Sequence, residues 1–473
     1  MNNGILLINP PANENSEAIS PKFMRDNYAF NYPPLGLLYL AANLPSRYEC
    51  RIIDAPASRL TPSNCIEEIN KFKPFLIGIT AFSDSLYSVH ELSKMIKEYD
   101  PNIIIVIGGP HVNIFPKETL TWGTVDYVLT GFCENTFANL AEILSSQEQT
   151  RMENIPGLWW REQDEIHKSL IDKDPSWNIN EIEMPDRELL DNSKYFTLAD
   201  QQTITTMISS RGCPFQCTFC DVFEKSFLTR SVDDLVKEIK HVLSLGIRQI
   251  HFFDDCFNLK RQRVIDLCRA FIENKLDFRW SFRGRLEPCD DELAQLLYKA
   301  GCRRAQIGIE ASDQETIKMI RKGINLSKVP EKLRIYKKAG VRTMGYFILG
   351  YPHQRLKDCV ESCKEIRKMG FDYINMFILI PYPNTEIYQN IFDDGMIKED
   401  IWKLHAIDPQ PNFKLPKWHP HVKRSELEAL LVSCYNKFYF SPRFILMELR
   451  RVKSLRDLSA KVKQAVAMII GNF

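Results

Sequence analysis

The sequence predicts an α/β protein: an N-terminal doubly wound, Rossmann-like parallel sheet, then a partial (β/α)6 barrel, then a helical C-terminal region. Three observations predict this fold. Apolar runs alternate with segments of helical period from residue 4 to about residue 145, which favours right-handed crossovers and a sheet covered on both faces. Six more strand and helix units follow residue 203, and the strand pattern ends near residue 395. We therefore expect four regions, at residues 1–148, 149–200, 201–395 and 396–473.

The composition indicates a globular protein with no nucleic-acid partner. Of the 473 residues, 44% are hydrophobic, which is enough for two or three domain cores. The 61 Lys and Arg residues balance the 60 Asp and Glu residues, so no basic patch for nucleic acid is expected. The 13 cysteines, and a start without the pattern of a secretion signal, predict reduced thiols in the cytoplasm. No stretch reaches the roughly 20 apolar residues that span a bilayer.

The first domain is expected to bind a ligand at one edge of its sheet. Its strand-like runs are GILLINPP, CRIIDAP, FLIGITAF, IIIVIGGP and VDYVLTG, with helical patterns such as LYSVHELSKMIKEY between them. Ligands of such sheets lie beyond the carboxyl ends of the strands, where NPP, DAP, TAFSD and GGPH fall. Residues 149–200 lose this rhythm, and we expect a linker with a small hairpin at GLWWREQDEIHKS.

The second series of strands predicts a barrel that stays open after six units. The strand-like runs are TITTMIS, QIHFFDD, FRWSFRGR, RRAQIGIEA, RTMGYFILGYP and YINMFILIPYP. Helical patterns such as SVDDLVKEIKHVLSLG separate them, and several end in a glycine that can cap the helix. Working residues of such barrels lie at the carboxyl ends of the strands. The first of these strands ends directly before a cysteine-rich loop.

The cysteines of that loop, Cys213, Cys217 and Cys220, have C-x3-C-x2-C spacing. Such a set binds zinc, binds an iron-sulfur cluster or only packs in a core. Structural zinc prefers four ligands, often in paired C-x2-C units, and no second pair follows here. Thiolates are the usual ligands of iron-sulfur clusters, and three of them leave one iron of a four-iron cluster open to a small molecule. We therefore favour a 4Fe-4S cluster.

This loop, the aromatic Phe219 before its third cysteine and the six units around it resemble the radical S-adenosylmethionine (SAM) enzymes. The resemblance implies that the open iron chelates the amino and carboxylate groups of SAM. An electron from the cluster, supplied by a donor such as flavodoxin or ferredoxin, then cleaves SAM to methionine and a 5'-deoxyadenosyl radical. The family places a group for the SAM ammonium after the second strand, where Asp254 and Asp255 stand. Adjacent strand residues point to opposite faces, so we expect one of the two to be structural.

The same resemblance implies further SAM contacts at later strands. Arg283 and Arg285 end the third strand, and we favour Arg285 because a guanidinium fork suits a carboxylate. Glu310 ends the fourth strand and is expected to bind ribose hydroxyls or to pair with a neighbouring arginine. Gly345, in the fifth strand, would let an adenine ring approach the backbone, or merely close a turn.

A parallel-sheet domain ahead of such a barrel resembles the cobalamin-binding domain of the cobalamin-dependent radical SAM enzymes. The residues that the resemblance assigns to cobalamin follow the strands and are Pro10, Asp54, Ser83, Gly108, Gly109 and His111. The two adjacent glycines leave room for the nucleotide tail beside the backbone. His111 is expected either to bond the tail or corrin ring or to be structural.

One departure from that family changes the expected cobalt ligation. Cobalamin domains that ligate cobalt from below carry D-x-H-x-x-G, whereas this chain reads DAPASR, with Pro56 at the histidine position. The resemblance therefore implies base-off cobalamin with no protein histidine on its lower face. The segment GFCEN also differs from the usual G-E-G-E, which weakens a role for Glu134.

The commonest reaction of this branch implies methylation of an unactivated carbon, or of phosphorus, through methylcobalamin, with SAM used twice. The alternative is radical oxidation, cyclisation or ring rearrangement of a tetrapyrrole, lipid or other metabolite. The anaerobic magnesium-protoporphyrin monomethyl ester cyclase, whose layout this chain resembles, is the example. A non-catalytic cobalamin or redox sensor is a third hypothesis, which the intact cysteine loop disfavours.

The end of the chain predicts amphipathic helices. From residue 425 the sequence reads SELEALLVSCYNKFYFSPRFILMELRRVKSLRDLSAKVKQAVAMIIGNF, with Lys and Arg beside Phe, Ile, Leu and Met. Such helices lie on a membrane surface or pack on a neighbouring domain. We favour packing over the barrel, while membrane contact would suit an apolar substrate such as a lipid or tetrapyrrole.

Overall fold

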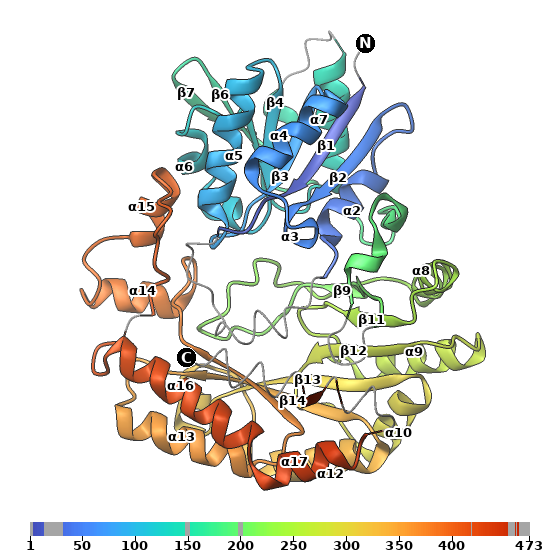
Figure 1. The fold of residues 1–473 in the computed structure, drawn as a ribbon, viewed down its shortest axis with the longest axis vertical. Helices are drawn as coiled ribbons and strands as arrows, with labels where there is room; N and C mark the ends of the chain where they lie inside the picture. The colour runs from blue at the N-terminus through green and yellow to red at the C-terminus, as the bar shows by residue number, and fades with distance from the viewer. Residues whose placement is uncertain are drawn as a thin grey trace. The chain divides into compact units, whose positions relative to one another are not determined.

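The computed structural model shown in Figure 1 describes residues 3–13, 32–146, 152–196, 202–417, 419–452, 459, 461 and 462. They form two compact units. The first unit is built from the described parts of Met1–Glu17, Asn31–Tyr195 and Lys398–Leu415, and the second from those of Phe196–Ile397 and Pro416–Phe473. The described residues of Lys398–Leu415 are grouped with the first unit.

The first unit contains the predicted parallel sheet, with the strand order β2-β1-β3-β4-β5-β6-β7. The parallel strands are β1 (Gly4–Asn9), β2 (Glu49–Asp54), β3 (Leu76–Thr80), β4 (Ile104–Gly108) and β5 (Tyr127–Leu129). The helices are α2 (Leu35–Ala42), α3 (Ala55–Ser58), α4 (Pro62–Phe72), α5 (Leu86–Tyr99), α6 (Pro116–Leu120), α7 (Glu134–Ser145) and α15 (Ile401–Ile407). The order reverses between β1 and β3, so the ligand crevice of such a sheet lies at their carboxyl ends.

Both faces of this sheet are buried, which explains the nearly continuous apolar strands. In β1, Leu6 and Ile8 join a core that includes side chains of α4 and α5. Ile5 and Leu7 point the other way and join a core with side chains of α2 and α7. Alternate residues of a strand face opposite sides, so a strand between two helix layers must be apolar throughout.

The predicted hairpin forms, and it extends the first sheet. Strands β6 (Leu158–Glu162) and β7 (Glu165–Lys168) are antiparallel, and β6 pairs with β5 through contacts such as Val128 with Trp159. The pattern of apolar residues predicts a hairpin but not the strand that it joins. The domain limits given above stay predictions.

The second unit contains six parallel strands in the order β15-β14-β13-β12-β11-β8, which confirms the six predicted runs. They are β8 (Ile204–Met207), β11 (Gln249–Phe252), β12 (Arg279–Gly284), β13 (Cys302–Glu310), β14 (Arg342–Leu349) and β15 (Tyr373–Ile378). The helices are α8 (Val232–Ser244), α9 (Arg261–Glu273), α10 (Asp291–Lys299), α11 (Gln314–Met319), α12 (Val329–Ala339), α13 (Leu356–Lys368), α14 (Glu386–Asp393), α16 (Arg424–Tyr439) and α17 (Pro442–Leu449).

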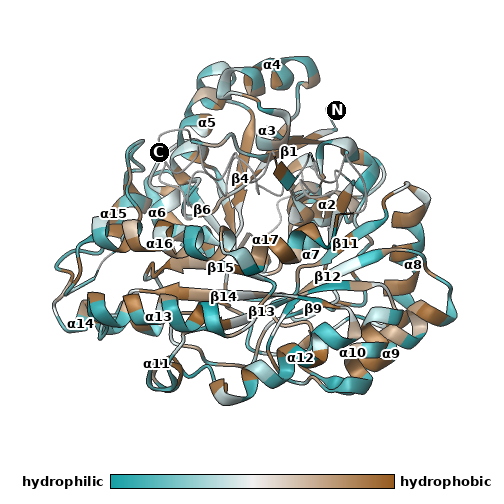
Figure 2. Cartoon of the chain, turned by 60° about the horizontal axis from the view of Figure 1, so that its bottom comes forward, coloured by the Kyte–Doolittle hydropathy of each residue, from teal (hydrophilic) through white to brown (hydrophobic). Residues whose placement is uncertain are grey.

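In β14 and β15, one face of the sheet is buried against the helices and the other face is half-buried. In β14 and β15 every second residue is buried and the residues between them are half-buried. The buried set includes Phe347 and Ile374, which join one core with residues of α9, α10 and α12. Those helices carry hydrophilic and hydrophobic residues side by side in Figure 2, as expected for helices with one buried face. We call the opposite face of the sheet its inner face.

Helix α16 closes the edge of the sheet at β15. The hydroxyl of Tyr435 accepts a hydrogen bond from Met376 N (2.7 Å) and donates to Met376 O (3.0 Å). Tyr439, one turn later, makes the same pair of contacts with Ile374 N (3.1 Å) and Ile374 O (2.6 Å). Edge strands expose unpaired backbone groups, and here two tyrosines satisfy them.

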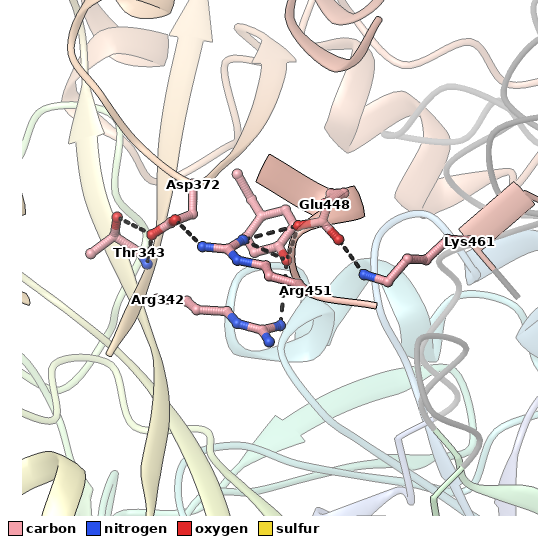
Figure 3. A network of polar contacts seen from close by, with 7 residues as sticks. Arg342, Thr343, Asp372, Glu448, Arg451 and Lys461 are labelled. Atoms are coloured by element: carbon pink, nitrogen blue, oxygen red, sulfur yellow. Dashed lines mark hydrogen bonds and ion pairs between the residues drawn. The ribbon is translucent and has the colours of Figure 1, made fainter. Parts of the chain in front are cut away.

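An ionic network joins α17 to the start of the last two strands (Figure 3). Asp372, before β15, accepts hydrogen bonds from Thr343 N (2.9 Å) and from Arg451 Nη2 (2.6 Å). Arg451 also pairs with Glu448 (2.9 Å), which in turn binds Lys461. Helix α17 and Arg451 therefore pack on the barrel at the amino ends of its last two strands.

Among the described residues, no helix combines the length and apolar character needed to cross a bilayer. Part of the predicted amphipathic C-terminal segment, residues 453–458, 460 and 463–473, lies outside the described residues, as does Trp418.

Candidate functional site

The three predicted cluster cysteines lie in a closed loop at the carboxyl end of β8. The short strands β9 (Ser210–Arg211) and β10 (Leu228–Thr229) pair at its base. All three are free, partly buried thiols. Burial, together with the smaller effect of the charges of Asp221, Cys217 and Cys213, raises the pKa of Cys220 to about 11, while a backbone hydrogen bond at Val222 opposes the shift. Thiolates at this site therefore need a neighbouring cation, which a cluster provides.

The three thiols of the loop lie close enough for their charges to act on one another. Within the described ranges, no group of three His, Cys, Asp or Glu side chains could hold one metal ion. Burial also raises the pKa of Cys213, and the charge of Cys217 contributes to that shift. The donor set, three adjacent thiols, fits the ligands of an iron-sulfur cluster.

Backbone contacts fix the shape of this loop. Gly212 has a φ of +84°, and a Cβ there would overlap the carbonyl oxygen of Ser226. Its N–H donates to Asp255 Oδ2 (2.8 Å). Thr218 is held on both sides, since its N–H donates to Ile320 O (3.2 Å) and its carbonyl accepts from Ile387 N (2.9 Å). Segments far away in sequence thus anchor the loop.

The two adjacent aspartates after β11 have different environments. Asp254 is 2% exposed and accepts hydrogen bonds from Ser209 N (2.7 Å), Ser209 Oγ (2.5 Å) and Ser210 Oγ (2.5 Å). Burial raises its pKa, and the nearby charge of Arg263 opposes that shift. Asp254 is therefore occupied in holding the strand end, whereas Asp255 is exposed. The contact between Asp255 and the SAM ammonium stays a prediction.

Arg285 also contacts the cysteine loop. Its guanidinium lies 3.8 Å from the ring centroid of Phe215, and its Nη2 donates to the carbonyl of Lys322. The side chain of Asn258 pairs with the Arg285 backbone in both directions, at 2.9 Å and 2.8 Å. These contacts favour a role in positioning the loop, and the predicted contact with the SAM carboxylate stays untested.

Glu310 pairs with a lysine rather than with an arginine. Lys322 Nζ lies 2.8 Å from Glu310 Oε1, and both side chains are buried. The same ammonium lies 5.9 Å from the ring centroid of Phe219. Glu310 has a φ of +75° where the pairing of β13 with β14 shifts register. Lys322 could not be predicted from the sequence, because it lies in a connection after α11, outside every strand end.

Gly345 is required by packing on the helix side of the sheet. A Cβ at this position would lie 2.6 Å from Phe347 Cε2 and 3.0 Å from Phe371 Cδ2. The missing side chain therefore leaves room for core aromatics. An adenine contact through the Gly345 backbone stays a prediction.

In the first unit, Asp54 and Pro10 lie at the ends of β2 and β1. Asp54 is buried and accepts hydrogen bonds from Asn9 Nδ2 (2.9 Å) and Tyr195 Oη (2.8 Å). It also caps α3 through Ala57 N (3.5 Å). Asp54 therefore joins three segments of the protein, and Pro10 is buried beside the Asn9 contact. The contact of Tyr195 with Asp54 could not be predicted from the sequence, because Tyr195 lies in the expected linker.

The adjacent glycines after β4 serve different purposes. Gly109 has a φ of +106°, and a Cβ there would lie 2.8 Å from Ala81 O and 2.9 Å from Thr80 Oγ1. It allows the ends of β3 and β4 to approach. A Cβ added at Gly108 would have one described atom within 4 Å, Leu129 O at 3.9 Å. Gly108 therefore has open space beside it, unlike Gly109.

His111 and Ser83 meet at the same end of the sheet. His111, the first residue of a short helix (His111–Asn113), is 1% exposed, and its Nδ1 lies 3.1 Å from Ser83 Oγ. Burial lowers the pKa of His111 to about 3, with a smaller contribution from His405. Its Nε2 has no hydrogen-bond partner within the described part of the chain. A buried polar atom normally has a partner, and the polar periphery of cobalamin can supply one.

The neutral state of His111 predicts a pH dependence. Its folded pKa of about 3 lies below the unfolded value of 6.5, so the unfolded chain binds the extra proton between these values. Stability is lost as the pH falls through this window. Replacing His111 with Gln should make the free energy of unfolding fall less between pH 7 and pH 5, by roughly 2 kcal/mol. Urea titrations at both pH values measure this, and equal losses would contradict the assignment.

Comparison with known proteins identifies the type of each domain. A family model for the B12-binding domain matches residues 21–141, and one for the radical SAM superfamily matches residues 207–366. An uncharacterized methyltransferase of Pyrococcus horikoshii is 30% identical over 427 residues, covering 88% of this chain and 90% of that protein. The anaerobic magnesium-protoporphyrin IX monomethyl ester cyclase of Rubrivivax gelatinosus is 25% identical over 453 residues, covering 92% and 80%.

The fold resembles the solved structure of TsrM from Kitasatospora setae, a radical SAM methyltransferase with cobalamin and a 4Fe-4S cluster bound. The TM-score is 0.71 at 17% identity, covering 94% of this chain and 90% of that one. The predicted cofactors, cobalamin, SAM and a 4Fe-4S cluster, are thus those of its relatives. The chain belongs to the cobalamin-dependent radical SAM enzymes.

Proposed function

We propose that this enzyme methylates an unactivated carbon, or a phosphorus atom, of a small molecule or lipid. The observation that carries this proposal is the three-thiol loop, which no second C-x2-C pair follows in the sequence, in a chain that is 30% identical to an uncharacterized methyltransferase. When bound, the cluster supplies the electron that cleaves SAM, and cobalamin carries the methyl group. The barrel region, residues 201–395, would hold the cluster and SAM, and residues 1–148 would hold cobalamin.

The residues have distinct proposed roles. Cys213, Cys217 and Cys220 would hold the cluster, and a cluster held by three thiolates would keep one iron open for SAM. We assign the SAM ammonium to Asp255, because the carboxylate of Asp254 already accepts hydrogen bonds from Ser209 and Ser210. Arg285, Glu310, Phe219 and Gly345 form the rest of the proposed SAM site. In the first unit, Ser83 and His111 offer polar groups and Gly108 offers space, while Pro10, Asp54 and Gly109 shape the loops.

We propose that cobalamin binds base-off, with no protein imidazole on the lower cobalt face. Pro56, at the position of the ligating histidine in other domains, lies in the first turn of α3, which Asp54 caps. The Asp54 carboxylate, which would orient such a histidine, accepts a hydrogen bond from Tyr195 instead. Electron paramagnetic resonance of the Co(II) form tests this: splitting of the cobalt lines by a nitrogen nucleus would contradict it.

The fate of the SAM methyl group distinguishes methylation from cyclisation, the second candidate favoured by the cyclase relative. With SAM labelled at its methyl group and flavodoxin or ferredoxin as the electron source, methylation should place the label in the product. It should also yield S-adenosylhomocysteine together with 5'-deoxyadenosine. Radical oxidation or cyclisation should yield 5'-deoxyadenosine with no label in the product. A Cys217→Ala variant is the control for chemistry that does not need the cluster.

For the C-terminal helices we propose packing on the barrel rather than membrane binding. The hydroxyls of Tyr435 and Tyr439 in α16 form hydrogen bonds with the backbone of β15. The ionic network around Asp372 and Arg451 holds α17. Three apolar residues of α17 are nevertheless exposed, Ile445, Leu446 and Leu449. Flotation with liposomes tests the alternative: co-flotation that a triple Ser variant abolishes would contradict our proposal.

A further inference from the structure

Two arginines lie next to each other on the inner face of the barrel sheet. Arg283 is two residues after Ser281 in β12, so both point to the same face. Ser281 pairs with Arg304 of β13, and Arg283 pairs with Gln306. The charges of Arg283 and Arg304 both reach His251 of β11, which is fully buried and whose pKa burial lowers well below its usual value. The two guanidinium groups therefore share one region, and the histidine beside them is neutral.

Among the residues that the structure describes, neither arginine forms an ion pair with a carboxylate, although burial raises the pKa of Asp255 and the charge of Arg283 opposes that shift. Arg283 lies over the ring of Phe253, 4.0 Å from its centroid, and its buried Nε has no hydrogen-bond partner in the described ranges. Arg304 lies 5.3 Å from the ring centroid of Tyr373, and within the same ranges it makes no ion pair or side-chain hydrogen bond. The nearby carboxylate of Asp255 is bonded to Gly212 N in the cysteine loop.

Other arginines of this unit show what a structural role looks like. Arg230 pairs with the buried carboxylate of Glu238, and Arg451 pairs with Asp372 at 2.6 Å. Arg303, next to Arg304 in the sequence and on the other face, donates to the carbonyls of Tyr298 and Cys302. A half-buried guanidinium without such an acceptor reduces stability, which indicates that its acceptor arrives with a ligand.

The aromatic contacts orient these groups for recognition. A guanidinium stacked on a ring keeps its N–H groups in the plane of the stack, where they can bind two oxygens of one group. We propose that Arg283 and Arg304 bind an oxyanion, a carboxylate or phosphoryl group, on the substrate. Assigning this anion to the substrate rests on the proposed function, whereas the site itself does not.

SAM also has a carboxylate, and the depth of the arginines separates the two sources. Arg285 directly follows the last residue of β12, Gly284, which pairs with Ile307, and its guanidinium lies over the ring of Phe215 in the cysteine loop. Arg283 precedes Arg285 by two residues in the chain. Arg304 pairs with Ser281, which precedes Arg285 by four residues. Two residues of a strand span about 7 Å, so the backbone of Arg304 lies roughly 13 Å from that of Arg285, toward the amino ends of the strands. That depth favours a group of the substrate over the SAM carboxylate.

The test uses the reconstituted full-length protein and inorganic phosphate as the probe. Wild type, the double variant Arg283→Gln/Arg304→Gln and the control Arg303→Gln are titrated with phosphate at constant ionic strength by calorimetry. We expect wild type and control to bind alike and the double variant to bind at least about tenfold more weakly, as loss of charged hydrogen bonds predicts. Without phosphate, the double variant should have a Tm no lower than wild type, because neither guanidinium makes an ion pair with a carboxylate of the described residues.

Three outcomes would overturn the proposal. Equal phosphate affinity in wild type and double variant would remove the site. A clearly lowered Tm of the phosphate-free double variant would make the arginines structural. Loss in Arg304→Gln of the SAM-induced change in the spectrum of the reduced cluster would assign the anion to SAM.

Neither titration nor Tm requires turnover, so this proposal and the proposed function fail separately. Arginine-dependent phosphate binding in a protein that forms no 5'-deoxyadenosine would contradict the function alone. Normal 5'-deoxyadenosine formation with unchanged phosphate binding in the double variant would contradict the anion site alone.

Discussion

Replacing Cys213, Cys217 or Cys220 singly with alanine should abolish the formation of 5'-deoxyadenosine from SAM. We expect a fall of at least ~1000-fold, because the change removes a reacting centre rather than one contact to it. Iron and sulfide content after anaerobic reconstitution, with product formation measured by chromatography, gives both readouts. A variant that keeps its iron and its activity would contradict the cluster assignment.

Cys256 is the matched control for this experiment. It is buried, 2% exposed, and its thiol is close enough for the charge of Cys213 to raise its pKa, after burial itself. It lies outside the C-x3-C-x2-C motif. Cys256→Ala should keep its iron and lower stability by about 1 kcal/mol, as truncation of a small core side chain does. Iron loss equal to that of Cys217→Ala would instead make Cys256 a ligand.

The folds of both units could be predicted from sequence because each rests on local periodicity. The apolar runs of β1, β3 and β4 are buried on both faces, so their composition alone marks them as strands of a covered parallel sheet. The partner of the hairpin β6–β7 could not be predicted in this way. Its pairing with β5 depends on which sheet edge is free, and nothing in the hairpin sequence encodes that.

The candidate site could be predicted only where its residues are close in sequence. The cysteine spacing marks the loop by itself, whereas the partners of the later strand ends are distant. Asp254 is 45 residues from Ser209, and Arg285 is 37 residues from Lys322. Sequence alone therefore could not show that Asp254 and Arg285 hold the loop. The same limit hid Arg304, whose importance appears only when the register places it beside Arg283.

Replacing Asp254 with Ala should have the largest effect on stability among the site variants. Asp254 holds Ser209 and Ser210 through three hydrogen bonds, and Arg263 holds the Ser209 carbonyl from the other side at 2.6 Å. Without the carboxylate, buried donors lose their acceptor and the charge of Arg263 loses its counter-charge. Loss of one member of a buried charged set lowers the free energy of unfolding by roughly 3–5 kcal/mol.

Asp255→Ala separates this structural role from a role toward SAM. Asp255 is exposed and accepts one hydrogen bond, from Gly212 N, so its removal should lower the free energy of unfolding by about 1 kcal/mol. Denaturant titrations of the two variants measure the difference, and SAM affinity of the reconstituted Asp255 variant measures the binding role. Equal destabilisation by both substitutions would contradict the division of roles. An unstable Asp254 variant beside a stable Asp255 variant with weakened SAM binding would support it, since one carboxylate then holds the loop while the other faces the cofactor.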